Sequence, residues 1–138
     1  MKVTREEEHV KVDIERFLAE KAPLIDKTIE KYIPRKYGKN AILFQVDPPK
    51  YCCNVETINK AIADPVWDML DRGGKRWRPA LFLLICEALG KGEDFCLDFA
   101  IIPEVVHNGT LVVDDIEDSS EVRRGKPCTY KIFGIDIA

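Results

Sequence analysis

The spacing of apolar residues predicts helices along the first part of the chain. Apolar positions recur at helical intervals from about residue 5 to 21, and again from Leu24 to Tyr32. Proline removes a backbone donor, so we expect Pro23 to break or restart the helix between the two stripes and Pro34 to end the second. Beyond Pro34 the periodicity is lost, which predicts an irregular connection over residues 34–53.

A helix that Asn54 can cap is predicted from Val55 to about Asp71, with a kink or boundary at Pro65. The pair Gly73-Gly74 ends it. Two strongly apolar helices follow, at about residues 79–89 and 95–118, and residues 119–138 predict a basic loop and the start of another element.

No stretch shows the alternation of a β-strand, so the predicted fold class is all-α. The helix at 79–89 is apolar on nearly every side and should be central. Helices of this kind need neighbours on several sides, more than the remaining predicted helices supply. We therefore expect residues 1–138 to form an incomplete helical bundle.

Composition limits the classes of partner. The chain has 138 residues, 46% of them hydrophobic and 33% charged, which suits one domain with a core. A net charge of -3 argues against a general affinity for nucleic acid. Pro103, Glu104, His107 and Asn108 interrupt the most apolar run, so we expect no membrane span.

The cysteines predict a reducing environment. Cys52, Cys53, Cys86, Cys96 and Cys128 form no CxxC pair and lie at no zinc-ligand spacing with histidine. The first 16 residues lack the apolar region of a signal peptide. A cytoplasmic protein with free thiols is the expectation, with a redox-active Cys52-Cys53 pair as the alternative.

Four carboxylates crowd the end of the last long helix, at Asp114, Asp115, Glu117 and Asp118. Asp114 and Asp118 stand one turn apart, where like charges repel each other and the helix dipole disfavours anions. A cation should compensate, and Mg²⁺ commonly binds one or two carboxylates together with phosphate oxygens. His107 falls on the same stripe. The alternatives are a solvated acidic helix end and a histidine satisfied in the core.

Two basic clusters flank this acidic end in sequence. Residues 73–79, Gly-Gly-Lys-Arg-Trp-Arg-Pro, combine three cations with a glycine turn that opens a helix, as an anion site requires. Residues 123–127, Arg-Arg-Gly-Lys-Pro, follow the carboxylates directly. Either cluster alone also fits a solvated charge run or counter-charges to the acids. The three clusters together predict a metal-bridged diphosphate.

The order Gly73-Gly74-Lys75-Arg76-x-Arg78-Pro79, then His107, then Asp114-Asp115-x-x-Asp118, then Arg123-Arg124-Gly125-Lys126-Pro127 resembles the trans-isoprenyl diphosphate synthases of the polyprenyl synthetase family. The resemblance is close from about residue 71 to 134. It implies the N-terminal portion of an isoprenoid-synthase-type helical bundle. It also implies a transferase that condenses an allylic diphosphate with isopentenyl diphosphate.

By resemblance, the site residues take defined roles. Asp114 and Asp118 would bind Mg²⁺ and act with Arg123 in catalysis, while Arg123 would also contact the allylic diphosphate. Isopentenyl diphosphate would be held by the basic and histidine positions Lys75, Arg78, His107 and Arg124. The residue five before the first aspartate often limits product length in the family when it is aromatic. Here it is Gly109, which implies a geranylgeranyl or longer product.

The family also carries a second aspartate-rich motif, which has no counterpart in residues 1–138. One hypothesis is a synthase half, inactive alone, that needs a complementary C-terminal half or a second chain, in a homo- or hetero-oligomer. Another is a non-catalytic partner subunit that binds and modulates a full synthase. A terpene cyclase fragment would share the metal motif but would not need the Lys75 and Arg124 clusters. A smaller departure is Cys128, where the family usually has a small hydroxyl residue.

Overall fold

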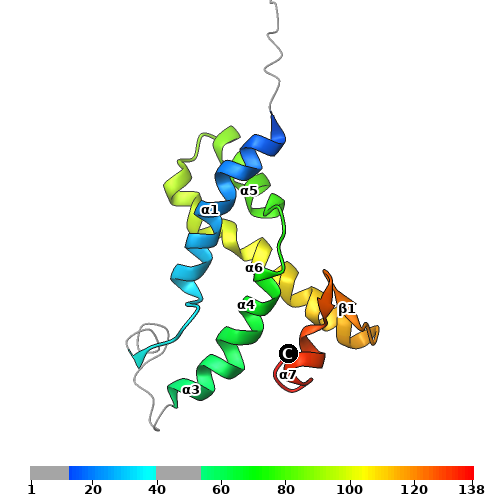
Figure 1. Ribbon diagram of the computed structural model, residues 1–138. Helices are drawn as coiled ribbons and strands as arrows, with labels where there is room; N and C mark the ends of the chain where they lie inside the picture. The colour runs from blue at the N-terminus through cyan, green and yellow to red at the C-terminus, as the bar shows by residue number, and fades with distance from the viewer. Residues whose placement is uncertain (1–12, 40–53) are drawn as a thin grey trace, which may run out of the picture.

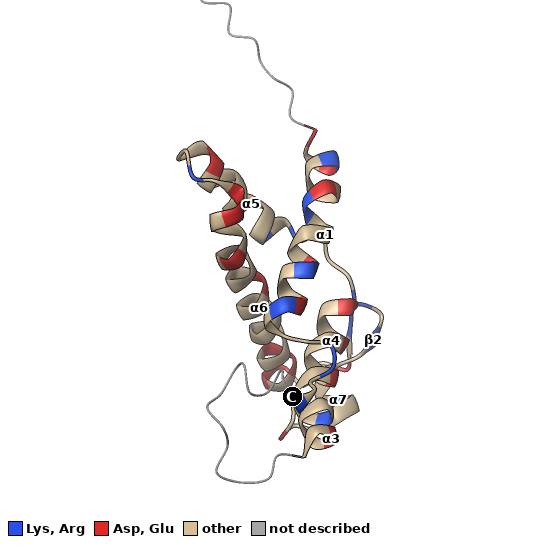
Figure 2. Cartoon of the chain, turned by 90° about the vertical axis from the view of Figure 1, so that its left-hand side faces the viewer, with Lys and Arg blue, Asp and Glu red and all other residues tan. Residues whose placement is uncertain are grey.

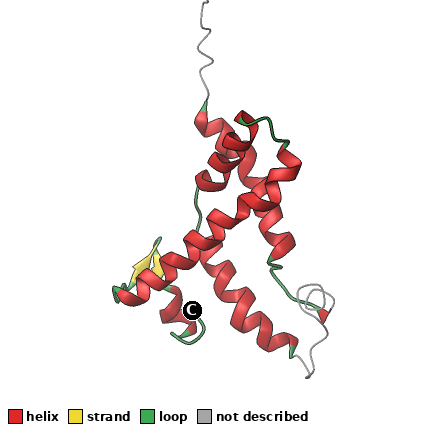
Figure 3. Ribbon diagram, turned by 180° about the vertical axis from the view of Figure 1, so that it is seen from behind, coloured by secondary structure: helices red, strands yellow, loops and turns green. Residues whose placement is uncertain are grey.

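The computed structural model describes residues 13–39 and 54–138 and confirms an all-α class. Helix α6 runs through the middle of this part, with α1 and α5 beside one half and a hairpin and α7 at the other end (Figures 1 and 3). The elements are α1 (Ile14–Tyr32), α3 (Val55–Ile58), η1 (Asn59–Ala63), α4 (Asp64–Asp71), α5 (Trp77–Ala88), α6 (Glu93–Glu117), β1 (Val122–Arg123), β2 (Lys126–Pro127) and α7 (Thr129–Phe133).

Helix α1 is continuous through Pro23, so the predicted break there is wrong. Asp13 caps its start by accepting a hydrogen bond from the Arg16 backbone N–H at 3.2 Å. Ile25 and Ile29 are completely buried beyond the proline, against a core shared with α5 and α6. Burial of these two side chains outweighs the one backbone bond that proline removes. The start of the first predicted stripe, before residue 13, lies outside the described residues.

The predicted capping by Asn54 is confirmed, because its side chain accepts from the backbone N–H groups of Glu56 at 2.9 Å and Thr57 at 3.2 Å. The helix that follows passes through a π-helical turn, η1, before Pro65. There the Asp64 N–H donates to the Asn59 carbonyl, and this wider turn is the irregularity predicted at Pro65. Residues 34–38 carry no helix or strand, and residues 40–53 of the predicted connection lie outside the described residues.

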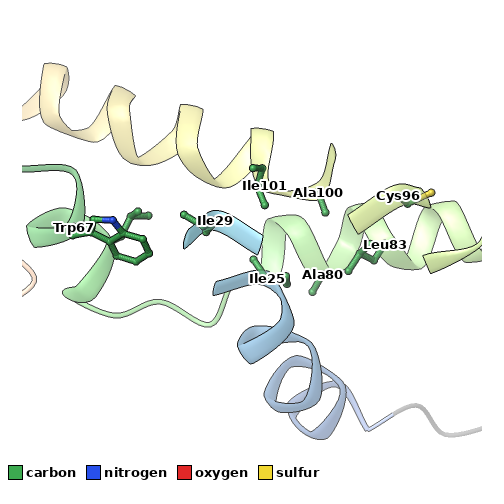
Figure 4. Close-up of a cluster of buried hydrophobic side chains, with 9 residues drawn as sticks. Ile25, Ile29, Trp67, Ala80, Leu83, Cys96, Ala100 and Ile101 are labelled. Atoms are coloured by element: carbon green, nitrogen blue, oxygen red, sulfur yellow. The ribbon is translucent and has the colours of Figure 1, made fainter. Parts of the chain in front are cut away.

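An apolar core forms where α1, α4, α5 and the first half of α6 meet (Figure 4). Trp67 anchors α4 in it, and its indole N–H donates to the Ile33 carbonyl at 3.1 Å. Pro79 stands in the first turn of α5, as predicted, where its missing N–H breaks no helical hydrogen bond. The helix that follows packs against α6. The buried members of this apolar cluster are Ile25, Ile29, Trp67, Leu70, Ala80, Leu83, Cys96, Ala100 and Ile101.

A short antiparallel hairpin follows α6, and the expectation of no β structure missed it (Figure 3). Val122 pairs with Pro127 and Arg123 with Lys126. The two residues between the strands, Arg124 and Gly125, have φ of 52° and 77°, as a type I′ turn requires. Strands of two residues are too short to show an alternating pattern, so the turn was the only available signal.

Large apolar side chains remain exposed on the far sides of α5 and α6. Leu81 and Ile85 of α5 are 45% and 51% exposed, so α5 is not the enclosed central helix that its sequence predicts. On α6 the exposed apolar residues share one stripe at helical spacing. Its members are Phe95, Phe99, Ile102, Val106 and Val113.

Helix α6 is the one helix within residues 13–39 and 54–138 that is long and apolar enough to cross a membrane by length and composition alone. A core helix passes the same test. In this structure α6 packs along α5 and α1, and it buries Glu104, Asn108 and Asp115.

Candidate functional site

The acidic end of α6 presents its carboxylates on two faces. Asp115 is 1% exposed, whereas the side chain of Asp114 is 55% exposed and Asp118 is also exposed. Arg123 of β1 donates to Asp115 Oδ1 from Nε at 2.8 Å and from Nη2 at 2.5 Å, and reaches Asp114 Oδ2 at 3.2 Å. The hydrogen bonds that Arg123 donates to Asp115 are the main cause that raises the pKa of Arg123. The buried Asp115 thus fixes Arg123 beside the exposed Asp114.

The hairpin is also tied to the glycine loop between α4 and α5. The Arg124 guanidinium donates from Nη1 to the Gly73 carbonyl, and Arg72 donates from Nη1 to the Arg123 carbonyl at 3.0 Å. Gly73 and Gly74 have φ of 93° and 149°, which L side chains rarely adopt. A Cβ on Gly74 would lie 3.8 Å from Arg124 Nη1, so the loop backbone passes close to the arginine.

His107 lies on α6, seven residues before Asp114, and positive charges from α5 and from the hairpin act on it. Burial lowers its pKa first, and the positive charges of Arg78, Arg124 and Arg123 lower it further, against an opposing effect of Glu104. Burial is likewise the main cause that lowers the pKa of Arg124, with nearby arginines adding to it. A place where burial and neighbouring positive charges lower the pKa values of both a histidine and an arginine favours a bound anion.

Lys75 is not brought into this group of cations. Its side chain is 74% exposed and lies 3.6 Å from Glu15 of α1. An exposed pair at that distance contributes little to stability. Arg78, by contrast, stacks on the Trp77 ring at 4.4 Å and contributes to the field around His107. The positive charges of Arg78, Arg123 and Arg124 therefore act on His107, whereas Lys75 lies on the α1 side of the glycine loop.

A buried ion pair that sequence reasoning missed supports the middle of the site. Arg76 is 5% exposed, with φ of 49°, and binds Glu104 Oε1 at 2.9 Å, Asp26 Oδ1 at 2.7 Å and the Leu70 carbonyl at 3.0 Å. Asn108 donates to the same Glu104 oxygen at 3.1 Å. The signal for this row was the spacing of Glu104, Asn108 and Asp115 on one face of α6. Glu104 and Asn108 were interpreted from the sequence only as interruptions of an apolar run, and Asp115 only as a member of the acidic cluster.

An apolar cavity of about 240 Å³ opens between α4, α6 and α7. Gly109 lines it, and a Cβ at that position would meet nothing within 4 Å. Asn108 Oδ1 and Thr129 Oγ1, both buried residues of its wall, have no hydrogen-bond partner among the described residues. The remaining wall is formed by Ile33, Ala61, Ile62, Pro65, Val66, Met69, Leu70, Val105, Val112, Ile137 and Ala138.

The donor set at the end of α6 suits Mg²⁺ when a phosphate ligand supplies further oxygens. The described residues contain no group of three or more His, Cys, Asp or Glu side chains arranged to hold a metal ion by themselves. Two exposed carboxylates one helical turn apart, Asp114 and Asp118, match the one or two protein ligands that Mg²⁺ commonly takes. Asp115 is unsuited to the same role because it is buried and bonded to Arg123.

Charged positions are spread over several helices, and acidic positions recur along α6 (Figure 2). Net charge therefore does not mark the site. What marks it is the sequence of contacts from Asp115 through Arg123 and Arg124 to the glycine loop. The last of these contacts, from Arg124 to Gly73, joins residues that are 51 positions apart in the chain.

Comparison with known proteins gives concordant matches. The model of the polyprenyl synthetase family matches residues 59–138. The farnesyl diphosphate synthase of Geobacillus stearothermophilus is 33% identical over 129 residues, which cover 92% of this chain and 37% of that protein. In Arabidopsis thaliana, the chloroplastic large subunit 1 of a heterodimeric geranylgeranyl pyrophosphate synthase is 29% identical over 136 residues, or 97% and 31% of the two chains.

A solved structure agrees with these matches. The geranylgeranyl pyrophosphate synthetase from the archaeon Geoglobus acetivorans superimposes with a TM-score of 0.63 and 31% identity, over 88% of this chain and 33% of that one. The chain therefore spans about a third of the length of the relatives it matches.

Proposed function

Since the chain belongs to the polyprenyl synthetase family, we propose that it carries the first aspartate-rich motif and the isopentenyl diphosphate site of a Mg²⁺-dependent prenyltransferase. The reaction joins an allylic diphosphate to isopentenyl diphosphate, forming a new carbon–carbon bond with loss of pyrophosphate. Turnover requires the helices of the rest of the family's fold, whether on a longer form of this chain or on a second chain. This chain alone is expected to bind diphosphate without turning it over.

One observation carries the proposal: Arg123, bound to Asp115 and Asp114, and Arg124, bound to the Gly73 carbonyl, connect the acidic end of α6 to the glycine loop, and both act electrostatically on His107. Arg78 of α5 and Arg124 of the hairpin act on His107 from different elements. Guanidinium groups bind phosphate oxygens in bidentate fashion. A histidine held neutral can still donate one N–H to such an oxygen without adding to the crowded positive charge.

The residues of the chain take separate roles in binding the two substrates and the metal ion. Arg78, His107 and Arg124 hold the isopentenyl diphosphate, with Lys75 able to swing in from its exposed position. Arg123, already oriented by Asp115, faces the allylic diphosphate beside Asp114. Asp114 and Asp118 would hold Mg²⁺. When bound, the ion would neutralise the departing pyrophosphate and so lower the barrier to breaking its bond to carbon.

The apolar cavity supplies the place for the hydrocarbon. It is walled by α4, α6 and α7, and Gly109 leaves its wall open five residues before Asp114. An apolar chain gains about 0.8 kcal/mol for each CH₂ group it buries there. A product of geranylgeranyl size is the length that we propose.

Binding of inorganic pyrophosphate by calorimetry tests the site. The full chain is expected to bind it more tightly with Mg²⁺ than without. The variant Asp114→Asn/Asp118→Asn should lose that Mg²⁺ dependence. Glu117→Gln removes an exposed carboxylate of the same turn that is not one of the proposed Mg²⁺ ligands, and this variant should bind as the unmodified chain does. Absence of Mg²⁺-dependent binding by the unmodified chain would sink the proposal.

Turnover is tested by supplying the C-terminal portion of the family's fold from a relative. The chain is mixed with the C-terminal portion of the Geobacillus stearothermophilus synthase, and incorporation of labelled isopentenyl diphosphate is measured. Prenyl product should form in the mixture only. In the active mixture, Gly109→Phe should shorten the product, because the ring would fill the cavity wall. Unchanged product length would show that the hydrocarbon lies elsewhere.

A second candidate function is a subunit that binds and modulates a complete synthase. The observation in its favour is the exposed apolar stripe of α6, from Phe95 to Val113, together with a relative described as the large subunit of a heterodimer. Exposed apolar stripes of this length commonly mark contact surfaces. Co-purification discriminates the two functions: a complete synthase as companion favours the modulator, and a chain with only the second aspartate-rich motif favours the split enzyme.

A further inference from the structure

The hairpin and the glycine loop are held by two hydrogen bonds that run in opposite directions. Arg72, at the end of α4, donates to the carbonyl of Arg123 at 3.0 Å, and Arg124 donates to the carbonyl of Gly73. In each case the side chain of one segment binds the backbone of the other. We call this pair the arginine clasp. It joins residues 51 positions apart in the chain.

Arg72 is the buried member of the clasp. Its side chain is 0% exposed, and its counter-charge is Asp68, whose oxygen accepts from Nη2 at 2.6 Å. The Nε of Arg72 has no hydrogen-bond partner among the described residues. A buried charge with an unsatisfied donor costs free energy, so Arg72 is a poor choice for stability alone.

This cost in free energy is offset by the role of Arg72 in holding the hairpin in place. Its turn residues Arg124 and Gly125 have positive φ, and its strands are only two residues long, so the hairpin has little stability of its own. The side chain of Arg123 donates to Asp115, and the backbone carbonyl of Arg123 accepts a hydrogen bond from Arg72. Arg123 is therefore fixed at both ends, and the direction of the following Arg124 is fixed with it.

We propose that Arg72 is a positioning residue of the diphosphate site, which orients Arg123 and Arg124 through the backbone of the hairpin. The inference rests on the proposed function, since it concerns the same anion site. Arg72 does not reach the ligand, because its side chain is enclosed and directed at Asp68 and at a backbone carbonyl. Its effect is transmitted by the clasp.

Arg72→Lys is the sharpest test. Lysine keeps the charge opposite Asp68, but one ammonium group cannot reproduce the planar fork that serves both Asp68 and the Arg123 carbonyl. Without any ligand, the backbone amide resonances of Arg124 and Gly125 should shift and broaden in this variant. In the presence of Mg²⁺, the dissociation constant of this variant for inorganic pyrophosphate should rise about tenfold. A change of that size corresponds to the loss of one charge-assisted hydrogen bond.

Arg35→Met is the matched control. Arg35 forms a bidentate pair with Asp71, next to Arg72 in sequence, at 2.7 and 2.9 Å, but it makes none of the clasp bonds. This variant should leave the hairpin resonances and the pyrophosphate dissociation constant within about twofold of the unmodified chain. Arg72→Met, measured where it is folded by circular dichroism, should weaken binding more than Arg72→Lys does.

Two results separate the possible failures. Hairpin resonances and pyrophosphate affinity in Arg72→Lys that match those of the unmodified chain would overturn the role of Arg72. Lack of pyrophosphate binding by the unmodified chain and by Arg35→Met would overturn the proposed function instead. In that event the ligand-free resonances still decide whether Arg72 holds the hairpin.

Discussion

The two halves of α6 bury opposite kinds of side chain on one continuous face. The part before Pro103, here called the apolar half, buries Cys96, Ala100 and Ile101 against α1 and α5. The part after Pro103, the polar half, buries Val112 but also Glu104 and Asp115, which bind arginines from other segments. The apolar half requires only that its neighbours be apolar and of the right size. The polar half requires particular partners at particular distances, and this is how the helix positions charges beyond its own surface.

Removal of the cation from the polar half should have the largest effect. Arg76→Met leaves Glu104, which is 4% exposed, without its partner at 2.9 Å. An uncompensated buried charge costs about 3–5 kcal/mol in the free energy of unfolding, to be measured by urea denaturation. The double variant Arg76→Met/Glu104→Gln should regain part of that loss. A fall no larger than that of Arg16→Met, which breaks an exposed pair, would contradict the contrast between the halves.

The apolar core around the first part of α6 should be destabilised by loss of side-chain volume alone. Ile29→Ala removes a fully buried side chain from the core of α1, α5 and α6, at an expected cost of about 2–4 kcal/mol. Ile14→Ala, at a position 59% exposed on the same helix, is the control and should change stability by less than about 0.5 kcal/mol. Pyrophosphate affinity of folded Ile29→Ala should stay unchanged, because the substitution moves none of the charged contacts.

A gain is expected at the cavity. Gly109 lies within α6, its φ is not positive, and a Cβ there meets no atom within 4 Å. Gly109→Ala should therefore raise the free energy of unfolding by about 0.5–1 kcal/mol, since alanine loses less backbone freedom on folding. Gly74→Ala is the comparison. With φ of 149° it should destabilise instead, and the opposite signs are readily seen as shifts of the thermal midpoint.

The smallest effect should be a dependence on pH through His107. Its pKa is lowered in the folded chain, mainly by burial and then by Arg78. The unfolded chain therefore takes up a proton that the folded chain resists as the pH falls through the ordinary histidine range. Stability should be lost on that descent. His107→Gln removes the contribution, so the difference in unfolding free energy between pH 7.5 and 5.5 should shrink. An unchanged difference would show that His107 is not set in a positive field.

The helices and the charged motifs could be predicted because each rests on local signals. Asn54 is a residue type that caps helices, and it predicts the helix that it begins. The four-residue spacing of Asp114 and Asp118 is enough to place them on one helix face. The continuity of α1 through Pro23 could not be predicted, because it depends on the burial of Ile25 and Ile29 by distant segments. Local propensity favours a break there, and tertiary packing reverses it.

The same division holds for the candidate site. The residue types of the basic clusters were evident, but not which of them meet. Lys75 and Arg76 are neighbours in sequence, yet one is exposed beside α1 and the other is buried against Glu104. The separation follows from the left-handed backbone at Arg76, with φ of 49°, which turns its side chain inward. Glycine spacing indicates that a turn occurs there and does not fix its direction.

The arginine clasp has a consequence for the order in which the chain folds. Its two bonds close a loop of 51 residues, whereas α5 and α6 are joined by a few residues and can pair early. Long loops form at a greater entropic cost and contribute late to the folding barrier. Competence to bind an anion is therefore expected to appear only in nearly native molecules, so recovery of pyrophosphate binding would time the final step of refolding.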